Sequence, residues 1–431
     1  MNRTFTLILA LVVLIAHILA IHDTDFDTFG PPYEIAHVAF RLTRNVVWDH
    51  SIAWNPGDAG FDVYPSPAWL AILTLTQRLY FGVNISQMIG IAAALGVVIT
   101  ASRFRPERFA GMIAPLLLIV NGGLAAAAAS GTEMALFALE ASLALLWFER
   151  RAPRRFLLAC FALTVTRPEG PILVLAFFLL EFTRKREERT GPLAIYLPSV
   201  LGVVTLWTAR YVIKGRLLSP ISESMLDFSA AQTLDGVIFL NEFAISQGTP
   251  FLAVIPVFFL LQGKLSRLGC RALILTSLWA ILIVLQGGAS LPFAQAMVPA
   301  LPFLFVTVQA SFINALDARM LVRRIALFLL ALSLVVGAMA SRTPSNFAAL
   351  RLEGVYESWL GEGSGGEYGF ERPMARAGLA EEIRNTRQLR EIGVFMRDNL
   401  APDHTIMTPW PGAIGYLTQL RVIDLLGRTN R

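Results

Sequence analysis

The side chains best suited to chemistry gather early in the chain, between residues 21 and 69. This stretch holds three of the five histidines and seven carboxylates but only two cations, Arg41 and Arg44. A positioned carboxylate can act as a general base that takes the proton of a hydroxyl group. We therefore predict a catalytic carboxylate here, and an acidic loop that is merely solvated stays open as the alternative. The carboxylates are Asp23, Asp25, Asp27, Glu34, Asp49, Asp58 and Asp62.

Three further charges stand in or beside apolar sequence. Arg167 and Glu169 interrupt the apolar stretch 156–182 within the letters TRPEG. Charges at membrane depth are costly and usually mark a function or a mutual pair, so these two either form a structural ion pair or Arg167 binds phosphate. Glu133, in SGTE at the start of an apolar run, either caps a helix or contributes to the site.

A second polar stretch, 210–225, carries Lys214 and Arg216. These cations either meet an anionic lipid head group or extend to the membrane surface as long basic side chains often do. The histidines lack a spacing such as HExxH, and the two cysteines form no CxxC pair, so the sequence indicates no metal site and no bound cofactor. A divalent ion beside the acidic stretch stays compatible with these residues.

Composition predicts the kind of helices on which these charged side chains are held. Of the 431 residues, 55% are hydrophobic and 16% are charged, whereas soluble domains carry about 25% charged residues. Many continuous apolar runs approach the ~20 residues that cross a bilayer. We predict an all-α polytopic membrane protein with about ten or eleven transmembrane helices. Nucleic acid is excluded as a partner, because the cations cluster in short loops.

Those loops also predict the topology. The first 21 residues read as an uncleaved first helix with Arg3 on the cytoplasmic side. Five further loops hold 17 Lys and Arg residues in total, and the positive-inside rule assigns them to the cytoplasm. The acidic loop 22–65 is then external. Within and after it we expect a surface helix at 33–47 and a short apolar helix at 66–81, and the stretch 156–182 should form a hairpin of two short helices.

The last ninety residues differ from the rest. Residues 1–340 form the predicted transmembrane domain, whereas 341–431 are polar and contain the flexible sequence GEGSGGEYG. We expect an external segment with an amphipathic helix at 381–400 and short strands at 405–407, 413–417 and 422–425. Such a segment resembles the beginning of a small α/β domain.

Several motifs occur in the order found in one known family. They are YEIAHVAFRLTRN (33–45), WNPG (54–57), FDVYPSPAW (61–69), SGTEMALF (130–137), LTVTRPEG (163–170), RYVIKGRLLSP (210–220), QGGASLPFAQAMVPALP (286–302) and GAIGYLTQLRVIDLLGRTN (412–430). Through them the chain resembles bacterial GT-C membrane glycosyltransferases, especially the branch of the mycobacterial terminal arabinofuranosyltransferases. Aligned on Arg44-Asn45, the two acids that this branch carries after its first span fall on Glu34 and Ile35. Its GGD-like run reads Gly287-Gly288-Ala289.

This resemblance implies a multi-pass protein of the bacterial cytoplasmic membrane that acts on the external face. It implies transfer of a sugar from a polyprenyl-phosphate donor to an envelope glycan or lipid acceptor, with inversion at the anomeric carbon. Glu34 is the first candidate for the base, followed by Asp25, Asp27 and Asp23. The substrate-binding candidates are Arg41, Arg44, Asn55, Tyr64, Glu133, Arg167, Glu169, Lys214 and Arg216. The rival hypotheses are a transporter and a non-catalytic scaffold of envelope polysaccharide assembly.

Overall fold

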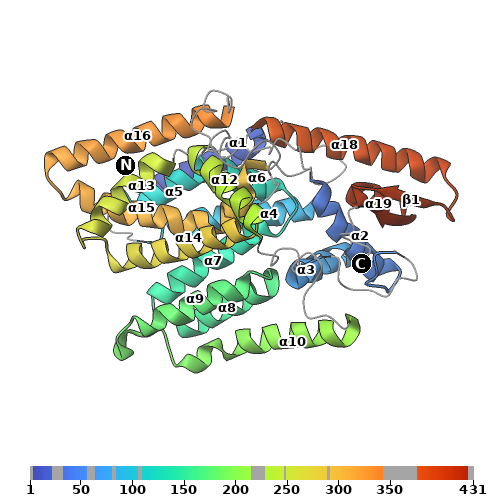
Figure 1. Cartoon of the computed structure of the whole chain (residues 1–431), viewed down its shortest axis with the longest axis horizontal. Helices are drawn as coiled ribbons and strands as arrows, with labels where there is room; N and C mark the ends of the chain where they lie inside the picture. The colour runs from blue at the N-terminus through green and yellow to red at the C-terminus, as the bar shows by residue number, and fades with distance from the viewer. Residues whose placement is uncertain are drawn as a thin grey trace.

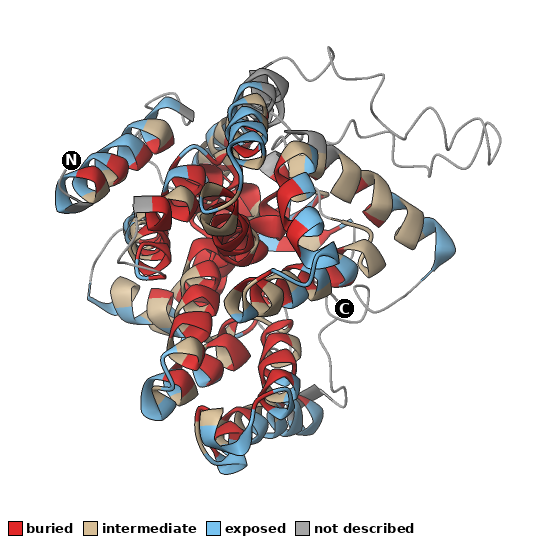
Figure 2. Ribbon diagram, turned by 90° about the vertical axis from the view of Figure 1, so that its left-hand side faces the viewer, coloured by how far each residue is buried: buried red, intermediate tan, exposed pale blue. Residues whose placement is uncertain are grey.

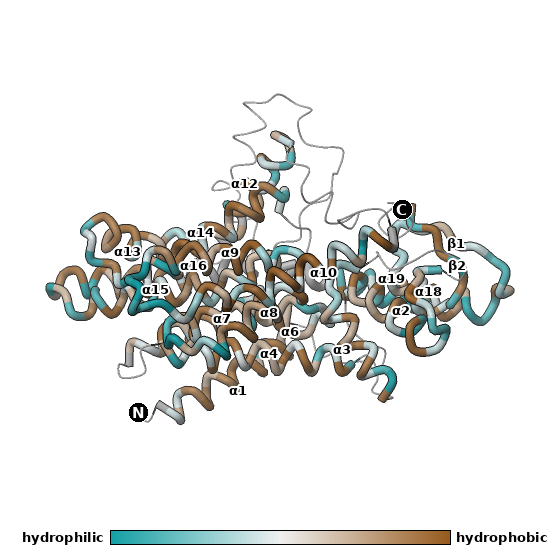
Figure 3. The backbone as a smooth tube through the Cα atoms, turned by 90° about the horizontal axis from the view of Figure 1, so that it is seen from below, coloured by the Kyte–Doolittle hydropathy of each residue, from teal (hydrophilic) through white to brown (hydrophobic). Residues whose placement is uncertain are grey.

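Helices build most of the molecule (Figure 1), and many of them are apolar (Figure 3). The computed structural model describes residues 3–21, 33–55, 64–79, 84–104, 109–214, 229–246, 249–288, 292–342 and 376–425. The α-helices up to residue 342 are α1 (Arg3–Ile21), α2 (Glu34–Trp48), α3 (Pro67–Arg78), α4 (Ile85–Ala101), α5 (Ile113–Ile119), α6 (Gly122–Ala129), α7 (Met134–Glu149), α8 (Pro153–Thr166), α9 (Gly170–Phe182), α10 (Leu197–Lys214), α12 (Ala230–Ser246), α13 (Thr249–Leu261), α14 (Arg267–Leu285), α15 (Leu301–Leu316) and α16 (Met320–Arg342). Four 3-10 helices join them: η1 (Phe109–Met112), η2 (Arg186–Glu188), η3 (Leu193–Tyr196) and η4 (Pro292–Ala300).

Only some of the described helices are long enough to cross a bilayer alone. Three stretches pass by length and hydropathy, Leu193–Val212, Arg267–Leu285 and Ala294–Leu316, and α5 with α6 makes a fourth if this pair, bent by 57°, counts as one span. Four more apolar helices have 10–17 residues, which is short of the ~20 residues of a perpendicular crossing. The class of all-α membrane protein is confirmed, and the number of spans stays a prediction.

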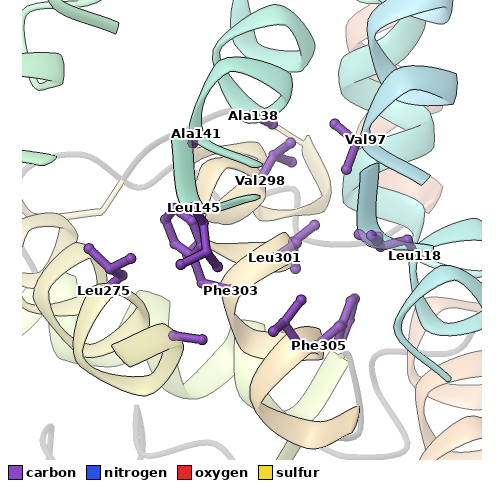
Figure 4. Packing of buried hydrophobic residues seen from close by; sticks show 14 of the residues in the cluster. Val97, Leu118, Ala138, Ala141, Leu145, Leu275, Val298, Leu301, Phe303 and Phe305 are labelled. Atoms are coloured by element: carbon purple, nitrogen blue, oxygen red, sulfur yellow. The ribbon is translucent and has the colours of Figure 1, made fainter. Parts of the chain in front are cut away.

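Small residues set the packing at the centre of the bundle. Buried residues lie on the facing sides of the helices (Figure 2), and Val97, Leu118, Leu145, Leu301 and Phe305 belong to one buried cluster (Figure 4). The alanine-rich helix α6 is buried almost throughout. A Cβ on Gly90 of α4 would lie 2.2 Å from the carbonyl oxygen of Ala128. Such close backbone approach is typical of membrane helices.

The predicted hairpin at 156–182 is present as α8 and α9. Residues 167–169 form the turn, and a Cβ on Gly170 would lie 1.8 Å from the carbonyl oxygen of Leu163. Glycine is therefore required at the start of α9. After the polar stretch 210–225, helix α12 packs against α14 and α16.

The C-terminal segment is a small β–α–β unit behind a long helix. It comprises α18 (Arg376–Asn399), β1 (Thr405–Thr408), α19 (Pro411–Thr418) and β2 (Arg421–Asp424). The strands are parallel, with Thr405 opposite Arg421 and Thr408 opposite Asp424. The prediction of a strand at 413–417 is wrong, because a parallel pair requires a crossover and α19 supplies it, with Pro411 at its first position.

This segment lies at one end of the molecule together with helix α2 of the acidic loop 22–65, which we call the first loop, and the neighbouring helix α3. Figures 1 and 3 both show α18, α19 and β1 beside α2, and α19 packs directly on α2. Segments more than 360 residues apart in sequence therefore form one end of the structure.

Candidate functional site

Eight of the predicted site residues have described side chains, and they form two groups at this end. Asp23, Asp25, Asp27 and Arg216 lie outside the described residues. Lys214 ends α10, and only its backbone is described.

Glu34 is the first residue of helix α2. Both its backbone N–H and its side chain form hydrogen bonds with the C-terminal segment. Its main-chain N–H donates to Oε1 of Glu382 at 3.2 Å. Its own Oε1 accepts a hydrogen bond from the main-chain N–H of Gly412. Glu34 is buried, with 8% of its surface exposed, so its carboxylate is held at the junction of α2, α18 and α19.

Arg41 and Arg44 follow on the same helix and also face the C-terminal segment. Arg41 donates from Nε to the carbonyl of Trp54 at 2.9 Å and from Nη2 to the carbonyl of Leu420 at 2.9 Å. Its guanidinium lies 4.4 Å from the centre of the Trp54 ring, a cation–π contact. Arg44 lies over the ring of Tyr416 and donates to that residue's carbonyl.

Asn55 pairs with the backbone of β2 as a neighbouring strand would. Its Nδ2 donates to the carbonyl of Val422 at 3.1 Å, and its Oδ1 accepts from the N–H of Val422 at 2.8 Å. Trp54 adds a bond from Nε1 to the same carbonyl. The structure thus uses Arg41, Arg44 and Asn55, three predicted substrate-binding residues, to join the first loop to the C-terminal segment.

His37 lies inside this junction and is fully buried. Its Nδ1 is 2.9 Å from the carbonyl oxygen of Tyr33, and its ring contacts those of Phe40 and Tyr416. Burial, with a smaller contribution from nearby Arg390, lowers the pKa of His37 to about 4. The imidazole is therefore neutral at pH 7, and it was not among the predicted site residues.

The second group is a cluster of Tyr64, Glu133, Arg167 and Glu169. Arg167 donates from Nε and Nη2 to both oxygens of Glu169, at 3.0 and 2.9 Å, and from Nη1 to Oε1 of Glu133 at 2.8 Å. The Tyr64 hydroxyl donates to Oε2 of Glu133 at 2.6 Å. Burial, with the Glu133 carboxylate beside it, raises the pKa of Tyr64 well above its ordinary value, so the hydroxyl keeps its proton.

Helix ends bring this cluster together. Glu133 directly precedes α7, Arg167 directly follows α8, and Glu169 directly precedes α9. The mutual pair of Arg167 and Glu169 expected from sequence is present, and Glu133 and Tyr64 extend it. Three of the five N–H groups of Arg167 donate to the carboxylates of Glu133 and Glu169, so its charge is already balanced within the protein.

Sequence reasoning missed two polar residues near these groups. Glu140, two turns into α7, accepts a hydrogen bond from Thr166 beside the Arg167 cluster, and a lone carboxylate within an apolar run was its signal. Gln295 of η4 donates to the hydroxyl of the buried Tyr33 at 2.8 Å. Within the described ranges, no three His, Cys, Asp or Glu residues are arranged to hold a metal ion.

An apolar cluster joins the two groups. Tyr33, Phe40, Trp54, Tyr64 and Trp69 share one buried core with the start of α3. Glu34 and the Arg167 cluster are therefore built on the same packed layer at one end of the helix bundle, and chemistry there would involve a carboxylate, a neutral tyrosine and a paired arginine.

Solved structures of one known protein are similar to this chain in fold. ArnT from Cupriavidus metallidurans bound to undecaprenyl phosphate is similar with a TM-score of 0.58 and 15% identity, covering 98% of this chain and 86% of that one. The same protein in the apo state gives 0.54 and 14%, covering 96% and 84%. The chain thus has an ArnT-like fold and is a multi-pass membrane protein.

Sequence comparison is less informative. Residues 381–431 match a domain of unknown function, DUF8728, which coincides with the C-terminal segment. No curated protein matches the sequence significantly. The GT-C part of the resemblance is consistent with the fold, and the arabinofuranosyltransferase branch stays a prediction.

Proposed function

We propose that the protein is a GT-C membrane glycosyltransferase of the bacterial cytoplasmic membrane. It moves a sugar from a polyprenyl-phosphate donor to an envelope glycan or lipid acceptor on the external face, with inversion. The observation that carries this proposal is the ArnT-like fold over 98% of the chain, because ArnT, itself a GT-C glycosyltransferase, is bound to undecaprenyl phosphate in one of its structures.

In this reaction Glu34 takes the proton of the acceptor hydroxyl, whose oxygen bonds to the anomeric carbon as the bond from that carbon to the phosphate oxygen breaks. The lipid phosphate leaves with the electron pair. Positive charge near it stabilises the transition state, and Lys214 and Arg216 are our candidates because Arg41, Arg44 and Arg167 have partners within the protein. Asp23, Asp25 and Asp27 stay the alternative bases.

The Arg167 cluster has a supporting role in this proposal. Two carboxylates and one guanidinium fix Tyr64 and the first turns of α7 and α9. Asn55 and Arg41 act on the acceptor side by holding the C-terminal segment in place. A divalent ion is not required by any step.

A transfer assay tests the proposal. Purified protein in lipid is given a panel of polyprenyl-phosphate sugars, and product is followed by mass and by the anomeric configuration of the new bond. Glu34→Gln should lower the rate by about 10²- to 10⁴-fold, the usual contribution of a general base. The matched control is Glu391→Gln on the exposed side of α18, which should leave the rate unchanged. Full activity of Glu34→Gln would shift the base to Asp23–Asp27.

One observation favours a second candidate, a non-catalytic scaffold. The predicted binding residues Arg41, Arg44 and Asn55 all contact the C-terminal segment. A scaffold would need those contacts but no base. Absence of product from every donor, with a correctly folded protein, would support the scaffold and contradict the enzyme.

A further inference from the structure

The N-termini of α2 and α19 are each capped by a carboxylate from a distant segment, that of α2 by Glu382 of α18 and that of α19 by Glu34 of α2. The residues that precede α2 and α19, Tyr33 and Trp410, make no side-chain cap, although the first N–H groups of a helix lack partners within it. The acceptors come from the other segment instead: Oε1 of Glu382 for the N–H of Glu34, and Oε1 of Glu34 for the N–H of Gly412. Carboxylates from distant segments thus replace the local caps that these two helices lack.

The approach is close enough to require glycine. A Cβ on Gly412 would lie 2.4 Å from the carbonyl oxygen of Glu34 and 2.7 Å from its Oε1. Gly415, nearly one turn later, would place a Cβ 2.5 Å from Nη1 of Arg41. Helix α19 therefore lies with its glycine face against α2. Gly393 of α18 is different, because its Cβ would meet only side-chain and Cα atoms at 3.2 Å or more.

We propose that the C-terminal segment is part of the catalytic site and that Gly412 is a positioning residue for the Glu34 carboxylate. This inference rests on the proposed function, which makes Glu34 the base. An ionised carboxylate offers about four lone-pair sites on two oxygens. One bond from the Gly412 N–H therefore fixes the rotation of the group and leaves it able to accept a proton.

The contact also favours the chemically useful form of the carboxylate. A hydrogen bond to the ionised group and the N-terminal end of α19 both stabilise negative charge. Gly412 itself forms and breaks no bond in the reaction: the proton passes from the acceptor hydroxyl to Glu34. Its effect is on geometry, where a displacement of about 1 Å can cost on the order of 100-fold in rate.

The test compares two alanine variants of the same helix. Gly412→Ala displaces Glu34, and we expect kcat to fall about 10- to 100-fold with an unchanged KM for the donor lipid. Gly415→Ala would meet the end of the flexible Arg41 side chain rather than the backbone of Glu34, so we expect it to lower kcat less than Gly412→Ala does. Gly393→Ala is the control for an alanine elsewhere in the segment. Equal losses of kcat in Gly412→Ala and Gly415→Ala would overturn the inference.

A double-mutant cycle isolates the contact. If Gly412 acts through Glu34, adding Gly412→Ala to Glu34→Gln should lower the remaining rate by less than about twofold, because coupled residues are not additive. Additive losses would overturn the positioning role. Should Gly412→Ala fail to fold, Glu382→Ala replaces it, because it removes the acceptor of the Glu34 N–H without adding a clash and should reduce kcat in the same way.

Different results would contradict the proposed function and the positioning role of Gly412. A wild-type protein that transfers no sugar contradicts the proposed function, and the positioning role with it. A wild-type protein that transfers sugar while Gly412→Ala, Glu382→Ala and Gly415→Ala keep the wild-type kcat contradicts only the positioning role and leaves the C-terminal segment as a structural cover.

Discussion

Among single residues, His37 is the one whose charge the structure constrains most clearly. Its ring is buried between α2 and α19, Nδ1 faces the carbonyl of Tyr33, and no described residue donates a hydrogen bond to Nε2. The charged and titratable groups around it are Arg390 of α18, Tyr416 of α19 and Tyr33. Protonating this imidazole in place would add a positive charge in an apolar site.

The protein should therefore lose stability in mild acid. The pKa of His37 is about 4 in the folded protein against 6.5 for the free side chain, so the unfolded chain binds the proton first. The stability is intact above pH 6.5 and falls as pH drops from 6.5 towards 4, by up to about 3 kcal/mol. Melting temperatures in detergent at pH 7 and pH 5 measure this loss.

Two variants separate His37 from other acid-sensitive groups. His37→Asn cannot take the proton and should reduce the difference between the two melting temperatures. His404→Asn, at an exposed position near β1, should leave it as in the wild type. An unchanged pH response in His37→Asn would show that the acid sensitivity has another origin.

Among the contacts between secondary-structure elements, the contact of Asn55 in the first loop with strand β2 can be tested by one substitution. Asn55 forms two hydrogen bonds with the backbone of Val422. It therefore pairs with the edge of the two-stranded sheet of β1 and β2. Asn55→Ala removes the acceptor of the buried Val422 N–H and one of the two donors to the Val422 carbonyl, which keeps its bond from Trp54. This change costs about 1–3 kcal/mol. We expect β2 to open locally more often while the helix bundle stays folded.

Hydrogen exchange measures that opening directly. The amides of 421–424 should exchange faster in Asn55→Ala, whereas those of α7 should not change. Asn399→Ala is the matched control, because Asn399 bonds only within its own exposed helix end. Equal protection of β2 in the wild type and in Asn55→Ala would mean that Asn55 does not hold the strand.

The same elements show what sequence can predict. Helices such as 33–47, and the hairpin at 156–182, follow from local apolar patterns and prolines, and the structure has both. The helix at 411–418 was missed because its short run AIGYL fits a strand as well as a helix. Its conformation is decided by the crossover between β1 and β2, a constraint outside the local sequence.

The site shows a similar limit. The pair of Arg167 and Glu169 is two residues apart and was predictable. The contact of Arg41 with Leu420 spans 379 positions, and no periodicity in the sequence predicts it. Motif order marked Glu34, Arg41 and Asn55 as important, but only the fold shows that they meet the C-terminal segment.

For the whole molecule, the orientation in the membrane is the property on which the proposed chemistry depends. The C-terminal segment and helix α2 of the first loop occupy one end (Figures 1 and 3), and Glu133 and Arg150 lie at opposite ends of helix α7. The loop after α7, together with the first turn of α8, holds four arginines, at 150, 151, 154 and 155. Moving four cations across the membrane opposes the positive-inside rule, so that loop should be cytoplasmic and the C-terminal segment external.

Cysteine labelling in sided vesicles tests this orientation. In a background with Cys160→Ala and Cys270→Ala, a single cysteine is placed by Asn399→Cys or by Arg154→Cys, both at exposed positions. A membrane-impermeant maleimide should label the Asn399→Cys protein in right-side-out vesicles and the Arg154→Cys protein only in inside-out vesicles. The reverse pattern would place Glu34 in the cytoplasm. Transfer on the external face would then be untenable, because the base and the C-terminal segment that positions it lie at the same end of the bundle.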